Sequence, residues 1–239
     1  MIGYGKYLDS GEMSLSDRGV SAREYEVYST LVKDVVLGAD FVERTGYNEG
    51  RYVTLSSTKR SDEVRAGIEV LRQLVEGVDL SRILVVGVGN PRMTTDRLGV
   101  ETVSRLRSKK LRTLCPSVEG VTGIPSIEVI DSVCMRIGAT CVIAIDALCA
   151  RSITRLGSSY QLTNAGIMIG GGVDRGTELS CRTLGVPVIA IGVPTVISTR
   201  DLVGDRRVGV ENLIVTPLNI DEIISISSTK IASMIDGVV

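Results

Sequence analysis

The stretch CVIAIDALCAR, residues 141–151, joins an apolar run to a single carboxylate, Asp146. An unbroken run such as Cys141 to Ile145 is typical of a strand that a parallel sheet buries on both faces. We therefore expect a central strand over 141–145, with Asp146 at its end. In open α/β sheets, ligands bind at the rim beyond the carboxyl ends of the strands. Asp146 is thus a candidate functional residue.

A second run of the same kind, RILVVGVG at residues 82–89, predicts another central strand. Between and around the two runs, helical and strand patterns alternate. Helices are expected over 21–36, 64–75, 96–107, 127–135 and from 220 to the tail, and further strands over 50–57, 160–162 and 186–191. The helix over 21–36 rests on a capping box from Ser21 to Glu24. This order predicts an α/β fold with a mostly parallel central sheet and helices on both faces.

The chain is expected to divide into an N-terminal segment with one helix, residues 1–49, and an α/β domain, residues 50–239. Hydrophobic residues make up 44% of the 239, which suits one such domain with a small appendage. The start of the chain lacks the basic and apolar regions of a secretory signal, and the most apolar later run, 185–197, contains two prolines. A soluble, cytoplasmic protein that does not enter membranes is therefore expected.

Charge and composition exclude several classes of partner and mechanism. The 27 basic and 28 acidic residues leave a net charge of -1, and only 3% of residues are aromatic, so direct nucleic-acid binding is not expected. Five cysteines without a CxxC pair indicate reduced thiols. The sequence contains no histidine, which excludes Ser-His-Asp triads, Cys-His dyads and HExxH zinc sites.

A second carboxylate, Asp96 in TTDRLG, follows the first buried strand just as Asp146 follows the other. If the two strands are neighbours, both carboxylates face one crevice. Two close carboxyl groups share a proton, and such a pair can activate water without an imidazole. The alternative is that each aspartate only caps the helix after it. A dinucleotide site at Gly87 to Arg92 is disfavoured, because the third glycine of the motif is missing.

Two glycine-rich loops, 118–124 and 164–173, could line the same crevice, since glycine lets a substrate backbone approach closely. Ordinary turns would give the same pattern. The candidate substrate-binding residues on these loops and beside Asp96 are Asn90, Thr95, Thr122, Gly123, Gly170, Gly171 and Gly172.

Taken together, VVGVGNPRMTTDRLG at 85–99, VIAIDALCARSI at 142–153 and GVPVIAIGVPTVI at 185–197 resemble the germination protease family of spore endopeptidases. The resemblance extends from about Gly50 to the C-terminus. It implies a peptidase-like domain over 50–239, with an α/β fold resembling that of the hydrogenase-maturation endopeptidases. The family's two functional aspartates map onto Asp96 and Asp146.

The resemblance implies an aspartic-type endopeptidase that cleaves small acid-soluble spore proteins during germination. It further implies a zymogen stage, a homo-oligomer with a tetramer as the assembly, location in the spore core or forespore, and no metal or cofactor. Where the family usually has proline and alanine around the first aspartate, this chain has Thr95 and Arg97, and Arg97 could lower the pKa of a neighbouring carboxylate or hold it in a salt bridge. The chain is also shorter than typical members between Thr199 and Leu213. A non-catalytic relative that uses the crevice for binding is the alternative, whereas a nickel-dependent peptidase is disfavoured because histidine is absent.

Overall fold

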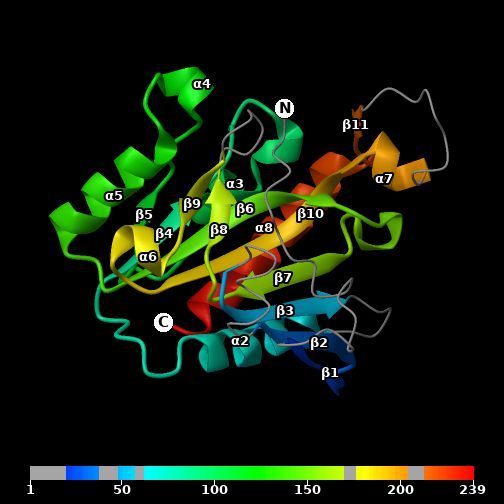
Figure 1. The fold of residues 1–239 in the computed structure, drawn as a ribbon, viewed down its shortest axis with the longest axis horizontal. Coiled ribbons are helices and arrows are strands. Elements are labelled where there is room, and N and C mark those ends of the chain that lie inside the picture. The colour runs from blue at the N-terminus through cyan, green and yellow to red at the C-terminus, as the bar shows by residue number, and fades with distance from the viewer. Residues whose placement is uncertain (1–19, 38–47, 57–61, 170–175, 204–212) are drawn as a thin grey trace.

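The computed structural model describes residues 20–37, 48–56, 62–169, 176–203 and 213–239. They form a nine-stranded sheet in the order β1-β2-β3-β7-β10-β6-β4-β5, in which β11 also pairs with β10, and a separate two-stranded sheet, β8-β9 (Figure 1). The strands are β1 (Val20–Val27), β2 (Thr30–Leu37), β3 (Gly50–Ser56), β4 (Ile83–Gly87), β5 (Arg112–Leu114), β6 (Cys141–Ala150), β7 (Ser159–Thr163), β8 (Ile167–Ile169), β9 (Thr177–Leu179), β10 (Val188–Ser198) and β11 (Ile214–Val215).

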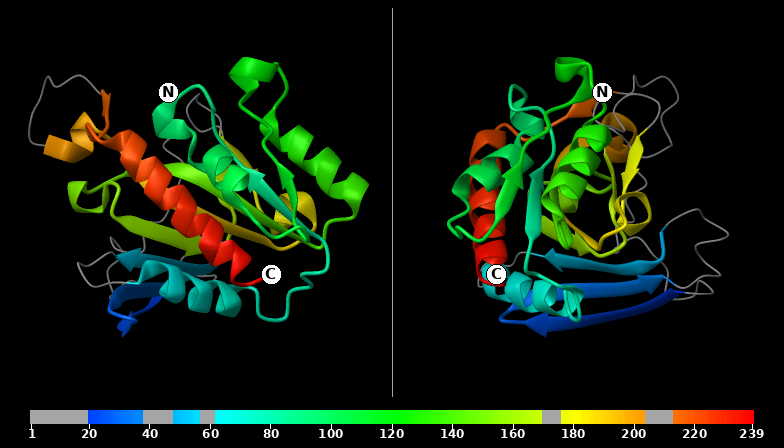
Figure 2. Two further views of the ribbon diagram at one scale, coloured as in Figure 1. Left: turned by 180° about the vertical axis from the view of Figure 1, so that it is seen from behind. Right: turned by 90° about the vertical axis from the view of Figure 1, so that its left-hand side faces the viewer.

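Helices pack on both faces of the large sheet, as the sequence predicts (Figure 2). They are α2 (Glu63–Leu74), α3 (Leu98–Arg105), α4 (Glu119–Thr122), α5 (Ser126–Ile137), α6 (Cys181–Leu184), α7 (Thr199–Val203) and α8 (Ile220–Asp236), with short 3-10 turns η1 (Thr94–Asp96) and η2 (Ile153–Arg155). One core layer lies between the sheet and α2, α3 and α8, and includes Ile143, Ile145 and Ile224. The other lies beneath α5 and the β8-β9 pair, and includes Ala144 and Ile130.

The α/β class is confirmed, but the expected mostly parallel sheet is wrong. Among the described strands, β10 with β6, β6 with β4 and β4 with β5 are parallel, and the other five pairings in the large sheet are antiparallel. Parallel neighbours need a crossover of a dozen or more residues, and the two-residue connection between β1 and β2 permits only an antiparallel pair. The sheet is therefore mixed, with its parallel part at the centre of the predicted site.

The expected helix over 21–36 is also wrong, because this stretch forms the β1-β2 hairpin. Val27 pairs with Thr30, and the two residues between them, Tyr28 and Ser29, have φ of 49° and 60°. Positive φ at both positions fits a type I′ turn, which matches the twist of a hairpin. The other predicted helices and strands are present, with boundaries that move by a few residues. There are two exceptions: the strand over 141–145 continues through Asp146 to Ala150, and the strand over 186–191 continues to Ser198.

The division of the chain at residue 49 stays a prediction, although β2 pairs directly with β3 and so joins the described part of residues 1–49 to the same sheet. No helix in the described ranges combines the length and the apolar character that a bilayer crossing requires.

A buried carboxylate, Asp34 of β2, links the hairpin to β3. Its side chain is only 2% exposed, and it accepts hydrogen bonds from Arg23 Nε at 2.8 Å and from Arg51 Nε and Nη2 at 2.8 and 2.9 Å. Burial alone would raise the pKa of Asp34, but the hydrogen bonds and charges of Arg51 and Arg23 outweigh it and hold the pKa below the ordinary value. The ionised form is therefore the one that the fold stabilises.

We predict that Asp34→Asn lowers the free energy of unfolding by about 3 kcal/mol at neutral pH, because it leaves Arg51 without its buried partner. Since the folded-state pKa is lowered, this stability is present above the ordinary carboxyl pKa and is lost as the pH falls through the folded-state value. Urea unfolding at neutral and acid pH measures it. Glu24→Gln is the control, because Glu24 is 59% exposed in its pair with Lys33 and should contribute less than about 1 kcal/mol. Equal losses for both variants would contradict the prediction.

Candidate active site

Asp146 lies at the point where β6 extends beyond the end of its neighbour β4. The pairing of β4 with β6 ends at Gly87 opposite Ile145, whereas β10 continues alongside β6 and places Gly192 opposite Asp146. Val88 N–H donates to the carbonyl of Ile145 at 2.9 Å, and the chain then leaves the sheet. Side chains alternate along a strand, so Asp146 shares the face of Ala144. Its side chain is half-buried.

Asp96 is the last residue of η1, which follows the loop after β4. Its Oδ2 accepts a hydrogen bond from the backbone N–H of Asn90 at 2.8 Å, and its own N–H donates to the carbonyl of Met93 at 2.9 Å. Gly89 lies directly against it with φ +114°, where a Cβ would come within 1.9 Å of the Asp96 carbonyl oxygen. Only glycine fits at position 89, so the loop closes tightly on Asp96.

Both carboxyl groups hold their protons more tightly than ordinary aspartates. Burial raises the pKa of Asp96, and the hydrogen bond from Asn90 partly opposes this. Burial raises the pKa of Asp146 well above its usual range, the negative charge of Asp96 raises it further, and a hydrogen bond from Ala147 N–H at 2.8 Å opposes both. The structure thus brings the two predicted aspartates within electrostatic reach of each other. Such a pair can share one proton and polarise a water molecule.

The predicted substrate-binding residues have different surroundings. Asn90 lies against Asp96 and also accepts the Arg92 N–H at its Oδ1, at 3.0 Å, and Thr95 lies within η1. Exposed Thr122 closes the end of α4, where its hydroxyl donates to the carbonyl of Ile124 at 3.0 Å, and Gly123 follows with φ +71°. Thr122 and Gly123 therefore have the ordinary-turn geometry that the sequence analysis gave as the alternative. Gly170, Gly171 and Gly172 lie outside the described residues.

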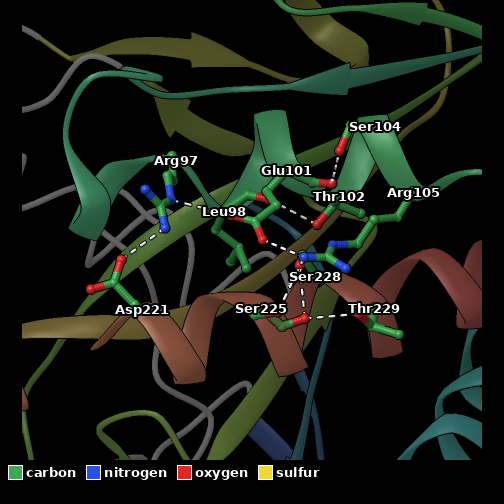
Figure 3. Close-up of polar contacts among 10 residues, drawn as sticks. All are labelled: Arg97, Leu98, Glu101, Thr102, Ser104, Arg105, Asp221, Ser225, Ser228 and Thr229. Carbon is green, nitrogen blue, oxygen red and sulfur yellow. Dashed lines mark hydrogen bonds and ion pairs between the residues drawn. The ribbon is translucent and has the colours of Figure 1, made fainter. Parts of the chain in front are cut away.

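Arg97 turns toward Asp221 at the start of α8 (Figure 3). Its Nη2 donates to Asp221 at 2.8 Å, and its Nε donates to Glu101 at 3.2 Å, while Glu101 also accepts from Arg105. Burial raises the pKa of Asp96 and the Asn90 hydrogen bond opposes the rise, whereas Arg97 makes no contribution to the shift. The hypothesis that Arg97 lowers the pKa of the neighbouring aspartate is therefore wrong, because its two acidic partners occupy it.

Two residues of β10 that the sequence analysis did not select complete the site. Gly192 has no side chain beside Asp146, and a Cβ there would lie 2.6 Å from the side chain of Leu148. Thr195, which is 0% exposed, donates its hydroxyl to the Thr95 carbonyl at 2.7 Å. The available signal was a single hydroxyl in the apolar run GVPTVI, since a buried hydroxyl needs a partner.

Cysteine nucleophiles and metal ligands are the other chemistry that these residue types could supply. The five cysteines are free, and burial raises the pKa of Cys149, as does the charge of Asp201, so its thiol is not activated. Within the described ranges, no three Cys, Asp or Glu side chains are grouped in a way that could hold a metal ion.

Comparisons with known proteins place these observations in a family. The germination protease family model matches residues 8–208, and so begins before Gly50. The chain is 31% identical to the germination protease of Priestia megaterium over 79% of its length, covering 58% of that protein. For the germination proteases of Bacillus cereus and Oceanobacillus iheyensis the identities are 33% and 34%, over 82% and 83% of this chain and 61% and 63% of theirs. The chain thus spans about 60% of the length of these relatives.

Among solved structures, the NiFe hydrogenase maturation protease HycI from Thermococcus kodakarensis matches with a TM-score of 0.44 and 17% identity, over 71% of this chain and 97% of that one. We draw no conclusion about the site from a likeness of this strength.

We predict that Gly89→Ala displaces the loop that carries Asp96, because the new Cβ meets backbone and φ is +114°. The free energy of unfolding should fall by about 3 kcal/mol, in the upper range for single substitutions. Gly185→Ala is the matched control: its φ is +69° but its Cβ would meet nothing within 4 Å, so we expect a loss of about 1 kcal/mol. Chemical denaturation of both variants measures the difference, and a Gly89→Ala variant no less stable than the control would show that the close packing is unimportant.

Proposed function

The chain belongs to the germination protease family, and from this premise we propose that it is an endopeptidase in which Asp96 and Asp146 together activate water. The observation that carries the proposal is the pair itself. Two aspartates from neighbouring segments have raised pKa values, and the charge of one raises the pKa of the other. Groups perturbed in this way are typical of acid-base catalysis.

The surroundings suggest which aspartate holds the shared proton. The Asn90 N–H donates to Asp96 and favours its ionised form, while burial and the Asp96 charge favour protonated Asp146. In our proposal Asp96 takes a proton from a water molecule whose oxygen adds to the peptide carbonyl carbon. Asp146 donates its proton to the carbonyl oxygen. The product is a neutral tetrahedral diol.

The diol then collapses with the proton transfers reversed. Asp96 gives its newly acquired proton to the amide nitrogen, and the C–N bond breaks. Asp146 recovers a proton from one diol hydroxyl as the carboxylic acid product forms. Both aspartates return to their starting states, so one water molecule is consumed and no metal or cofactor takes part. Each proton transfer contributes roughly 10²- to 10⁴-fold to the rate.

The proposed substrate class is supported by membership of the family, whose name refers to germination. We propose that the substrates are small acid-soluble spore proteins and that the enzyme acts in the spore core, as a homo-oligomer for which a tetramer is expected. We also propose that the enzyme is activated from a zymogen. Asn90 and Thr95 flank Asp96 and are the best placed of the predicted substrate-binding residues. Contacts of the substrate with Thr122, Gly123 and Gly170 to Gly172 stay predictions.

The alternative, a relative that binds spore proteins without cleaving them, rests on Arg97 beside the first aspartate and on the short stretch between Thr199 and Leu213, much of which lies outside the described residues. Because Arg97 pairs with Glu101 and Asp221, it leaves the carboxylate pair unneutralised. This favours the catalytic function over the binding one.

We predict that Asp96→Asn and Asp146→Asn each lower the rate of cleavage of a purified small acid-soluble spore protein by about 10²- to 10⁴-fold, because each removes one proton-transfer group. Asp236→Asn is the control, since it removes a carboxylate whose described contacts are with the backbone N–H groups of Arg107 and Ser108, and it leaves Arg97 in its pairs. Electrophoresis of timed digests measures the rates. Cleavage that survives both changes would reject the dyad, and an intact chain that binds the substrate without cleaving it would support the alternative.

We also predict a bell-shaped dependence of kcat/KM on pH. The rate rises as the pH rises through the lower apparent pKa of the pair, because the base must be ionised, and falls through the upper one, because the acid must hold its proton. Both limbs lie at higher pH than ordinary aspartates would give, since both pKa values are raised. Initial rates across the acid and neutral range measure the profile. A rate that keeps rising into the alkaline range would contradict it.

A further inference from the structure

Thr195 is a polar residue in a strand, β10, that is buried along its whole length. All eleven residues of β10 are buried, and the Thr195 side chain is 0% exposed. A hydroxyl in such surroundings is costly unless it forms a hydrogen bond. It donates to the main-chain carbonyl of Thr95 at 2.7 Å, a contact that joins residues 100 positions apart. The partner is therefore the turn η1, which carries Asp96.

A bulge directs Thr195 toward that turn. The pairing of β10 with β6 is regular as far as Pro194 and Leu148, and then shifts, so that Val196 pairs with Cys149. Thr195 is the extra residue, and an extra residue of this kind can redirect its side chain out of the regular pattern. The carbonyl of Thr195 in turn accepts the hydroxyl of Thr216 at 2.9 Å. The bulge is thus held on both sides by hydrogen bonds.

The two ends of this contact belong to the two halves of the catalytic pair. Thr95 precedes Asp96 in η1, while β10 is hydrogen-bonded to β6, which carries Asp146 opposite Gly192. We infer that Thr195 is a positioning residue: its hydroxyl fixes η1 against β10 and so fixes the distance between the carboxyl groups of Asp96 and Asp146. The inference rests on the proposed function, because it concerns the same pair. Small misplacements of catalytic groups cost up to about 100-fold in rate.

The test compares Thr195→Val, which keeps the shape and removes the hydroxyl, with Thr195→Ser, which keeps the hydroxyl. Thr102→Val is the matched control, because Thr102 is also a 0% exposed threonine whose hydroxyl donates to a backbone carbonyl, that of Leu98 at 2.8 Å, but it lies within α3. Side-chain carboxyl NMR follows the titration of Asp146, thermal unfolding follows stability, and cleavage of a purified small acid-soluble spore protein gives kcat and KM.

We expect Thr195→Val to lower the pKa of Asp146, because η1 moves and the charge of Asp96 acts on it less. The value of kcat should fall by about 10- to 100-fold, with little change in KM. Thr195→Ser should keep the pKa of Asp146 and the value of kcat close to those of the unmodified protein. Thr102→Val should lower the stability without changing the pKa of Asp146 or kcat. A Thr195→Val variant that loses stability but keeps the Asp146 titration would show a purely structural role and overturn the inference.

Two further arms keep the inference falsifiable. If Thr195→Val does not fold, Thr216→Val replaces it, since Thr216 is exposed and its hydroxyl holds the bulge; a smaller fall in the pKa of Asp146 is expected, and an unchanged pKa overturns the inference. The titration needs no substrate. Cleavage that survives Asp96→Asn and Asp146→Asn would therefore reject the proposed function, while the NMR result still decides whether Thr195 sets the geometry of the pair.

Discussion

The unequal length of two parallel strands is the constraint on which the site depends. β4 ends opposite Ile145, and β6 continues beside β10 to Ala150. In the described sheet, the β4 side of β6 is therefore open from Asp146 onward. The chain leaving β4 turns back into this space through Gly89, and η1 brings Asp96 to it. The proximity of the two aspartates is thus a property of the strand pairing, and the hydroxyl of Thr195 secures it from the other side.

Burial and the hydrogen-bond partners of each carboxylate together decide its protonation state. Asp34 is almost completely buried, yet its pKa is lowered, because Arg23 and Arg51 donate to it. For Asp146, burial raises the pKa, the charge of Asp96 raises it further, and the N–H of Ala147 is the one hydrogen bond among the described contacts that opposes them. The first arrangement stabilises the fold. The second is costly to the fold, and buried groups kept at such a cost are candidates for function.

The sequence predicts the parallel centre of the sheet well and its periphery poorly. The apolar runs at 82–89 and 141–145 leave no reasonable alternative to buried strands, and the absence of histidine directs attention to Asp96 and Asp146. The sequence does not predict the β1-β2 hairpin because Tyr28 and Ser29 lack the Asn-Gly pattern of a tight turn. In addition, Ser21 and Glu24 match the capping-box pattern of a helix N-terminus. The contact of Thr195 with Thr95 depends on a bulge, which spacing in the sequence does not reveal.

The central claim is that the two carboxyl groups titrate as a coupled pair. The most direct test is a carboxyl NMR titration of the unmodified protein beside Asp96→Asn. The account predicts that in the unmodified protein both aspartates keep their protons to higher pH than ordinary aspartates. It also predicts that removal of the Asp96 charge shifts the titration of Asp146 to lower pH. An Asp146 that titrates like an exposed aspartate, or that does not respond to the loss of Asp96, would contradict it.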